Sequence, residues 1–82
     1  HRLWLYQPMP TLRQLRYLVT LADTGSFVQA ARSLNVSQPS LSQQIRALEE
    51  RLGVRLVERG PAGTILSPIG RTIVARSRGV LG

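Results

Sequence analysis

The chain of 82 residues has no cysteine and no lysine, and its one histidine, His1, stands at the terminus. Disulfides and zinc sites built from cysteine and histidine are therefore excluded within this sequence. Aromatic residues make up only 5% of the chain, which leaves few rings to stack on unpaired RNA bases. No apolar run approaches the roughly 20 residues of a transmembrane helix, and no segment has the pattern of a signal peptide. We expect one small cytoplasmic domain without a membrane partner.

The charge of the chain is strongly one-sided. Eleven arginines stand against four acidic residues, which gives a formal net charge of +7 at pH 7. Such an excess in a small domain indicates an anionic partner, most often nucleic acid. The sequence offers neither a His/Cys nucleophile pair, nor working paired carboxylates, nor a phosphate-cradling glycine loop. We therefore expect no enzyme, no catalytic residue, no cofactor and no metal.

Residues 37–53 carry the signals of a well-defined helix. Ser37 suits the N-cap, Pro39 falls in the first turn where its missing N–H costs nothing, and Gly53 suits the left-handed position that ends a helix. Four apolar residues recur at the spacing of one helix face: Leu41, Ile45, Leu48 and Leu52. The pattern predicts a helix of about four turns with one buried face.

The opposite face of the first two turns carries Gln38, Ser42 and Gln43. These uncharged side chains both donate and accept hydrogen bonds, as side chains that recognise base edges in the DNA major groove do. A polar surface that is simply exposed to water is the alternative, and this helix alone leaves both interpretations open.

Two shorter helices are predicted upstream. Residues 11–14 and 26–29 each fit a capping box, Gly25 can end the first helix, and Asn35 can make a left-handed turn before the cap at Ser37. The apolar face expected on the first helix is Leu12, Leu15, Leu18, Val19 and Ala22. A short helix, a tight turn and a longer capped helix together predict a helix-turn-helix.

The periodicity changes after Gly53. A hairpin is expected here, because residues 54–59 and 64–66 favour strands and the glycines and proline of 60–63 favour a turn. Two strands alone are only marginally stable, so the hairpin is expected to pack against the helices through Val54, Leu56 and Leu66. Ser67-Pro68 then predicts a last helix. Its uncovered apolar face carries Ile69, Ile73 and Val80, which suggests weak pairing with a second copy.

The predicted fold class is therefore mainly α: a winged helix-turn-helix, with a three-helix core and a two-stranded wing, followed by a linker helix. The expected organisation has three parts. Residues 1–8 are a tag or disordered extension, 9–67 are the DNA-binding domain, and 68–82 begin a truncated dimerisation helix.

The motifs described above resemble the N-terminal DNA-binding domain of LysR-type transcriptional regulators. The Ser-Gln-Pro-Ser-Leu-Ser run at 37–42 is suggestive by itself, and further matches lie at 12–17, 25–31, 34–36, 44–45, 48–49, 52–56, 58–59 and 67–70. The resemblance implies a longer bacterial regulator with an effector-binding C-terminal domain that is absent here. It also implies a homodimer or tetramer, paired through the linker helix, on interrupted palindromic promoter DNA.

By this resemblance, the helix at 37–52 enters the major groove and the wing at 54–66 meets the DNA backbone or minor groove. The expected DNA-binding residues are Ser37, Gln38, Pro39, Ser40, Ser42, Gln43, Arg32, Arg46, Arg59 and Thr64. Two positions depart from the family pattern, since Gln43 and Ala62 stand where many members carry a basic residue. The remaining alternative is a winged helix with a non-specific nucleic-acid or protein-interaction role.

Overall fold

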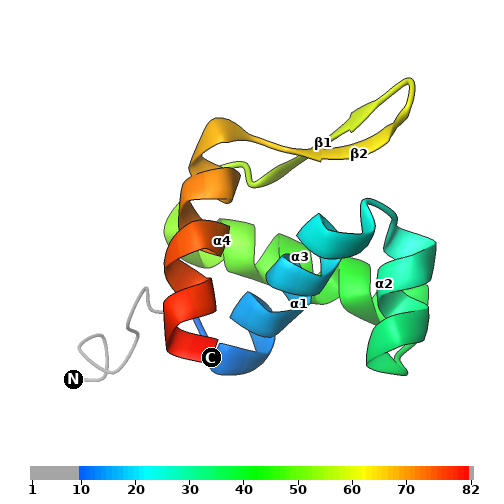
Figure 1. Ribbon diagram of the computed structural model, residues 1–82, viewed down its shortest axis with the longest axis horizontal. Helices are drawn as coiled ribbons and strands as arrows, with labels where there is room; N and C mark the ends of the chain where they lie inside the picture. Colours follow the sequence, from blue (N-terminus) through cyan, green and yellow to red (C-terminus); the bar gives the residue numbers. More distant parts are fainter. Residues whose placement is uncertain (1–9, 82) are drawn as a thin grey trace.

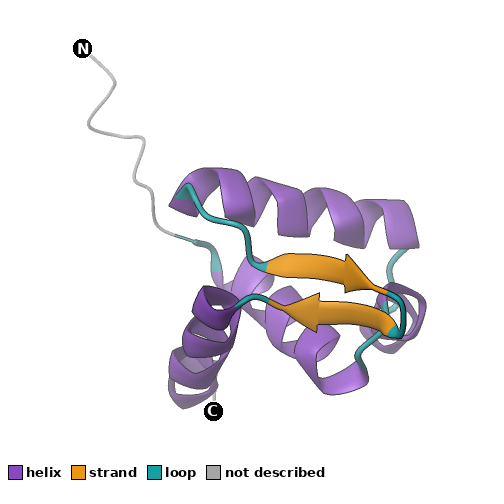
Figure 2. Ribbon diagram, turned by 90° about the horizontal axis from the view of Figure 1, so that it is seen from above, coloured by secondary structure: helices purple, strands orange, loops and turns teal. Residues whose placement is uncertain are grey.

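The structure is a computed structural model that describes residues 10–81. Its elements are α1 (Leu12–Thr24), α2 (Phe27–Leu34), α3 (Gln38–Leu52), β1 (Val57–Gly60), β2 (Gly63–Leu66) and α4 (Pro68–Leu81). Helix α1 packs against α2, α3 and α4, and the two strands form a hairpin on one side of the helices (Figure 1; Figure 2). The predicted winged helix-turn-helix with a following helix is confirmed, whereas the extension at 1–8 lies outside the described residues.

The helix boundaries follow local capping interactions. At the start of α1, the N–H of Gln14 donates to Thr11 Oγ1 at 3.0 Å, and the N–H of Thr11 donates to Gln14 Oε1 at 3.2 Å. The Ser26 and Ser37 hydroxyls accept the N–H groups three residues later in α2 and α3. Each of these helices ends at a left-handed residue: Gly25, Asn35 and Gly53. The predicted cap residues are thus confirmed, and so is the capping box at 11–14. Of the capping box predicted at 26–29, the structure shows the bond from the Gln29 N–H to Ser26 Oγ and not the reciprocal one.

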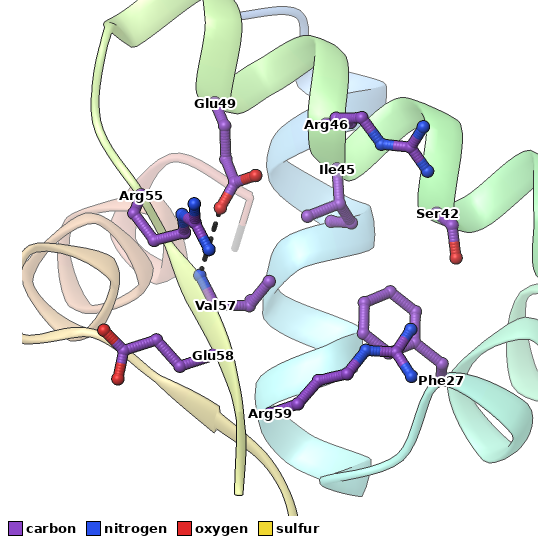
Figure 3. A pocket seen from close by; sticks show the side chains of 9 residues that line it. All are labelled: Phe27, Ser42, Ile45, Arg46, Glu49, Arg55, Val57, Glu58 and Arg59. Atoms are coloured by element: carbon purple, nitrogen blue, oxygen red, sulfur yellow. Dashed lines mark hydrogen bonds between the residues drawn. The ribbon is translucent and has the colours of Figure 1, made fainter.

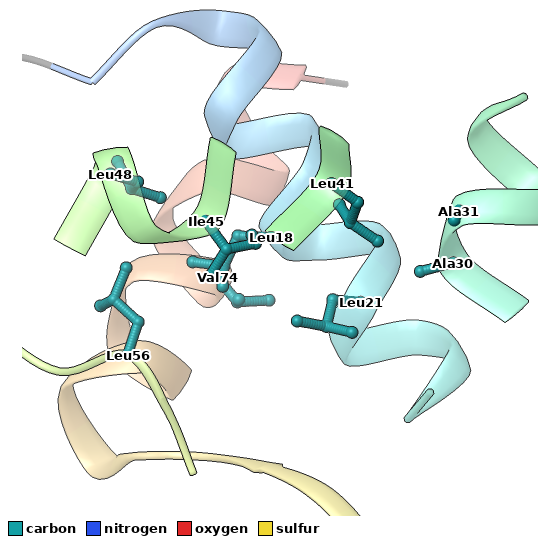
Figure 4. Packing of buried hydrophobic residues seen from close by; sticks show 9 residues of the cluster. All are labelled: Leu18, Leu21, Ala30, Ala31, Leu41, Ile45, Leu48, Leu56 and Val74. Atoms are coloured by element: carbon teal, nitrogen blue, oxygen red, sulfur yellow. The ribbon is translucent and has the colours of Figure 1, made fainter. Parts of the chain in front are cut away.

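The hydrophobic core is formed by side chains from all four helices and by Leu56, which precedes β1 (Figure 4). Its fully buried large side chains are Leu18, Leu21, Leu41, Ile45, Leu48 and Leu56. The apolar face predicted for α1 was partly wrong, because Leu12 is 58% exposed whereas Leu21 and Gln14 are buried. Helix α1 packs against three helices, α2, α3 and α4, so its buried residues are not confined to the predicted stripe.

The hairpin is shorter than the sequence predicted. Strand β1 begins at Val57 and not at residue 54, and it pairs antiparallel with β2 so that Val57 faces Leu66 and Arg59 faces Thr64. The preceding backbone is bound elsewhere: the N–H of Leu56 donates to Glu49 Oε2 at 2.7 Å, and Leu56 C=O accepts from Ser67 N–H at 2.9 Å. Leu56 is buried, and Val54 and Leu66 pack partly against the core, as predicted.

Helix α4 packs along α1. Its buried side is Gly70, Val74 and Ser77, and Arg78 forms an ion pair with Asp23 at 2.7 Å. The hydrogen bond from Arg78 lowers the pKa of the Asp23 carboxyl below its ordinary value.

The apolar surface of α4 is smaller than the sequence predicted. Ile69 and Val80 are 44% and 67% exposed, but Ile73 packs partly against the core. The prediction that all three residues are uncovered was therefore wrong for Ile73, because α4 packs against α1 and partly covers this side chain. Among the helices at 10–81, none has the length and apolar character needed to cross a membrane.

Candidate nucleic-acid interface

The first two turns of α3 present a polar surface on a firmly held helix. Gln38, Ser40 and Gln43 are exposed, as are Ser37 and Pro39, and Ser42 is half-buried. On the other side, Leu41 and Ile45 are buried in the core. The structure therefore brings together all six residues predicted for this helix end, and it fixes their helix while leaving most of their side chains open to a ligand.

A groove of about 410 Å³ lies between α3 and the hairpin (Figure 3). Its lining is Phe27, Ser42, Ile45, Arg46, Glu49, Arg55, Val57, Glu58 and Arg59. Two of the predicted arginines, Arg46 and Arg59, thus face one groove from different elements. Five of the nine lining residues are charged, so the groove suits a charged ligand better than an apolar one.

Glu49 is the acidic residue of this groove that belongs to α3. Its Oε2 accepts hydrogen bonds from Leu56 N–H at 2.7 Å and from Val57 N–H at 3.3 Å. These bonds commit the carboxylate to the backbone that leads into β1. Glu49 consequently fixes the position of the hairpin relative to α3.

Arg59 contacts an aromatic ring. Its guanidinium carbon lies 5.5 Å from the centroid of Phe27, which is within the range of a cation–π interaction. Within residues 10–81, the charged group of Arg59 lies over Phe27 and forms no ion pair with a carboxylate. Thr64 stands directly across the hairpin from Arg59, so both project from the same face of the strands.

The other two predicted phosphate ligands differ in their surroundings. Arg46 is exposed, and within the described part of the chain it forms no ion pair with Glu49 or Glu50. Arg32 is exposed on α2 beside a shallow hollow that is also lined by Thr24 and Gln29. Arg32 is therefore separate from the groove at α3.

Six residues of the groove were absent from the predicted site: Phe27, Ile45, Glu49, Arg55, Val57 and Glu58. Nothing in the sequence places Phe27 beside Arg59, because the two belong to different elements that meet only in the folded domain. The one sequence signal that could have drawn attention to Glu49 is that acidic residues are scarce in this basic chain.

A helix-turn-helix with an exposed polar helix start, a hairpin wing and an arginine-lined groove defines a winged helix-turn-helix DNA-binding domain. Residues 12–71 match the family model described as the bacterial regulatory helix-turn-helix protein, lysR family. The chain belongs to this family and corresponds to its DNA-binding domain.

Relatives and solved structures agree with this assignment. The SDS degradation transcriptional activation protein of Pseudomonas sp. is 48% identical over 73 residues, which are 89% of this chain and 24% of that protein. The HTH-type transcriptional regulator EstR of Acinetobacter baylyi is 49% identical over 73 residues, again 89% of this chain and 24% of that protein. This chain thus spans about a quarter of the length of these transcriptional regulators.

Two structures show the same fold. The oxidized form of Corynebacterium glutamicum OxyR has a TM-score of 0.84 and 45% identity, covering 89% of this chain and 22% of that chain. The complex of the BenM DBD with catB site 1 DNA has a TM-score of 0.83 and 41% identity, covering 87% of this chain and 80% of that chain. The second of these was solved bound to DNA.

Proposed function

We propose that this domain binds duplex DNA sequence-specifically, with the start of α3 in the major groove and the hairpin against the backbone or minor groove. The observation that carries the proposal is the exposed polar surface of the first two turns of α3, held in place by buried Leu41 and Ile45. The DNA complex of a 41% identical domain with the same fold supports it.

The side chains divide into base-reading and backbone-binding groups. Gln38, Ser42 and Gln43 read base edges, and Pro39 contacts a thymine methyl. Because Gln pairs in bidentate fashion with adenine, Gln43 favours adenine where an arginine would favour guanine. The backbone-binding residues are Ser37, Ser40, Arg32, Arg46, Arg59 and Thr64.

The first test compares two alanine substitutions. Gln38→Ala is expected to weaken binding to the cognate duplex by about 1–3 kcal/mol and to change binding to a scrambled duplex little, because base contacts carry the specificity. Arg32→Ala is expected to weaken both complexes alike, because phosphate contacts are independent of sequence. Fluorescence anisotropy on a palindrome selected from random DNA measures both effects at several salt concentrations.

The wild-type domain is expected to favour the selected duplex by at least about a hundredfold. Equal binding to both duplexes would show that the arginines supply only non-specific attachment. Equal losses on both duplexes for Gln38→Ala would remove its role as a base reader.

In the whole protein, we propose that this domain belongs to a cytoplasmic transcriptional regulator without enzymatic activity. A C-terminal domain would bind a small-molecule effector, and two or four copies would assemble on an interrupted palindrome. The relatives are transcriptional regulators about four times as long as this chain, which supports the first part. The exposed apolar residues Ile69 and Val80 on α4, beside half-buried Ile73, support assembly through this helix.

The second test concerns this pairing. The isolated domain is expected to associate weakly with itself, and Val80→Glu is expected to abolish the association because it places a charge on the apolar surface of α4. Sedimentation equilibrium at high protein concentration measures the effect. Ile65→Glu is the matched control, since Ile65 is 56% exposed and belongs to β2 and not to α4. A strictly monomeric wild-type profile would contradict the proposal for this fragment.

A further inference from the structure

We infer that the groove between α3 and the hairpin holds one backbone phosphate of the duplex between Arg46 and Arg59, and that Phe27 is the residue that positions Arg59 for this contact. The inference rests on the proposed duplex binding. It adds a defined subsite to the interface and gives a recognition role to a residue that otherwise belongs to the core.

The charges of the groove are sorted along its length. In Figure 3, the Arg46 and Arg59 guanidinium groups lie toward the end that carries Ser42 and Phe27, whereas Glu49 and Glu58 lie toward the other end. Ser42 and Arg46 stand one turn apart on α3, so they present a hydroxyl and a guanidinium on the same side of the helix. An anion at this end meets two cations and a hydroxyl that can donate a hydrogen bond.

The carboxylate of Glu49 does not oppose an anion at that end of the groove. Its Oε2 already accepts from the N–H groups of Leu56 and Val57. Arg55 also lines the groove and adds a positive charge to it. The positive potential is consequently concentrated where Arg46 and Arg59 lie.

Phe27 supplies a fixed surface for the Arg59 side chain. Its ring packs partly against the core, and Phe27 is the first residue of α2, directly after the Ser26 cap. A guanidinium that stacks on a ring keeps the N–H groups at its edge available for a bidentate bond to phosphate. Because the stacked side chain is already ordered, less rotamer entropy is lost when the phosphate binds.

The location of the groove fits a DNA backbone. Ser42 lines the groove and also belongs to the polar surface of α3 proposed to face the bases. A strand whose bases are contacted by α3 therefore carries its phosphates past the side of the helix on which Arg46 lies. The hairpin closes this side, with Arg59 on the face that it turns toward the helices.

The test measures how duplex affinity depends on salt. Arg59→Gln is expected to weaken binding about tenfold on both the selected and the scrambled duplex, and to reduce the slope of log K against log salt by about one, because one phosphate contact is lost. Phe27→Leu, which keeps an apolar side chain but removes the ring, is expected to weaken binding about two- to fivefold. Phe27→Tyr is expected to retain wild-type affinity, since it retains the ring.

A double-substitution cycle separates positioning from packing. If Phe27 acts through Arg59, Phe27→Leu has no further effect on affinity in the R59Q background. If Phe27→Leu merely disturbs the fold, it weakens binding equally in both backgrounds, and the inference is overturned. Arg76→Gln is the charge-matched control, because Arg76 is exposed on α4 and does not line the groove.

Two further outcomes keep this inference distinct from the proposed function. A salt slope for R59Q no different from that for R76Q would overturn the phosphate subsite, even if the domain still preferred the selected duplex. Conversely, loss of the preference for the selected duplex would contradict sequence-specific binding. The slope effect of Arg59→Gln would still appear on both duplexes, because a phosphate contact does not depend on sequence.

Discussion

Replacing Glu49 by alanine is expected to lower the free energy of unfolding by about 2–4 kcal/mol, since two hydrogen bonds to a charged acceptor are lost. The N–H groups of Leu56 and Val57 would lose their shared acceptor, and a partly buried donor left without a partner costs free energy. Chemical denaturation followed by circular dichroism measures the change.

Glu50→Ala is the matched control for this substitution. Glu50 is the next residue of α3, is exposed, and changes the net charge by the same amount. Its replacement is expected to alter the free energy of unfolding by no more than about 0.5 kcal/mol. Equal effects of the two substitutions would show that the loss of negative charge, and not the bond to the 56–57 backbone, determines the stability.

Replacing Gly70 by alanine is expected to destabilise the domain by about 1–3 kcal/mol, because it forces extra volume into a packed contact. A Cβ at this position would lie 2.4 Å from the carbonyl oxygen of Leu56 and 3.2 Å from Ser67 Oγ. The first of these atoms belongs to the backbone and is held by the N–H of Ser67, so it cannot move aside cheaply. Thermal unfolding is expected to show a Tm lower by several degrees.

Gly79 provides the opposite result in the same helix. A Cβ at Gly79 would meet nothing within 4 Å, so Gly79→Ala is expected to stabilise the domain by about 0.5–1 kcal/mol through the helix propensity of alanine. Destabilisation by both alanines would contradict the argument from the close approach of α4 to Leu56. It would point instead to a general intolerance of side chains on this helix.

The sequence was sufficient for the features that depend on neighbours along the chain. Thr11, Ser26 and Ser37 cap helices within one turn of themselves, and Asn35 and Gly53 end them through their own backbone conformation. Signals of this kind need only a few residues in the correct order. The order of helices, hairpin and final helix could therefore be predicted before the structure.

The features that could not be predicted depend on contacts between distant elements. Strand β1 begins late because Glu49 and Ser67 bind the preceding backbone, and Leu12 is exposed although it belongs to the predicted apolar face, because the three helices around α1 cover other residues. Apolar periodicity identifies a face of a helix but does not say which neighbours will cover it. Ile73 is partly covered for the same reason.

The candidate site likewise has a part that the sequence predicts and a part that it does not. The polar start of α3 could be predicted because its residues follow one another on a single helix. The contact between Arg59 and Phe27 could not, since it joins the hairpin to the first turn of α2. The roles of the individual side chains toward DNA remain predictions for the experiments described above.

The backbone at 55–57 is bonded on one side to Glu49 of α3 and on the other to Ser67 at the start of α4. This double attachment fixes the angle between the two helices within one subunit. Where two copies join through α4, it consequently fixes the distance between their α3 helices. An operator with one additional base pair between its half-sites would turn one of them by about a tenth of a helical turn. The DNA would have to twist or bend to compensate, so this protein would select operators by their spacing as well as by their bases.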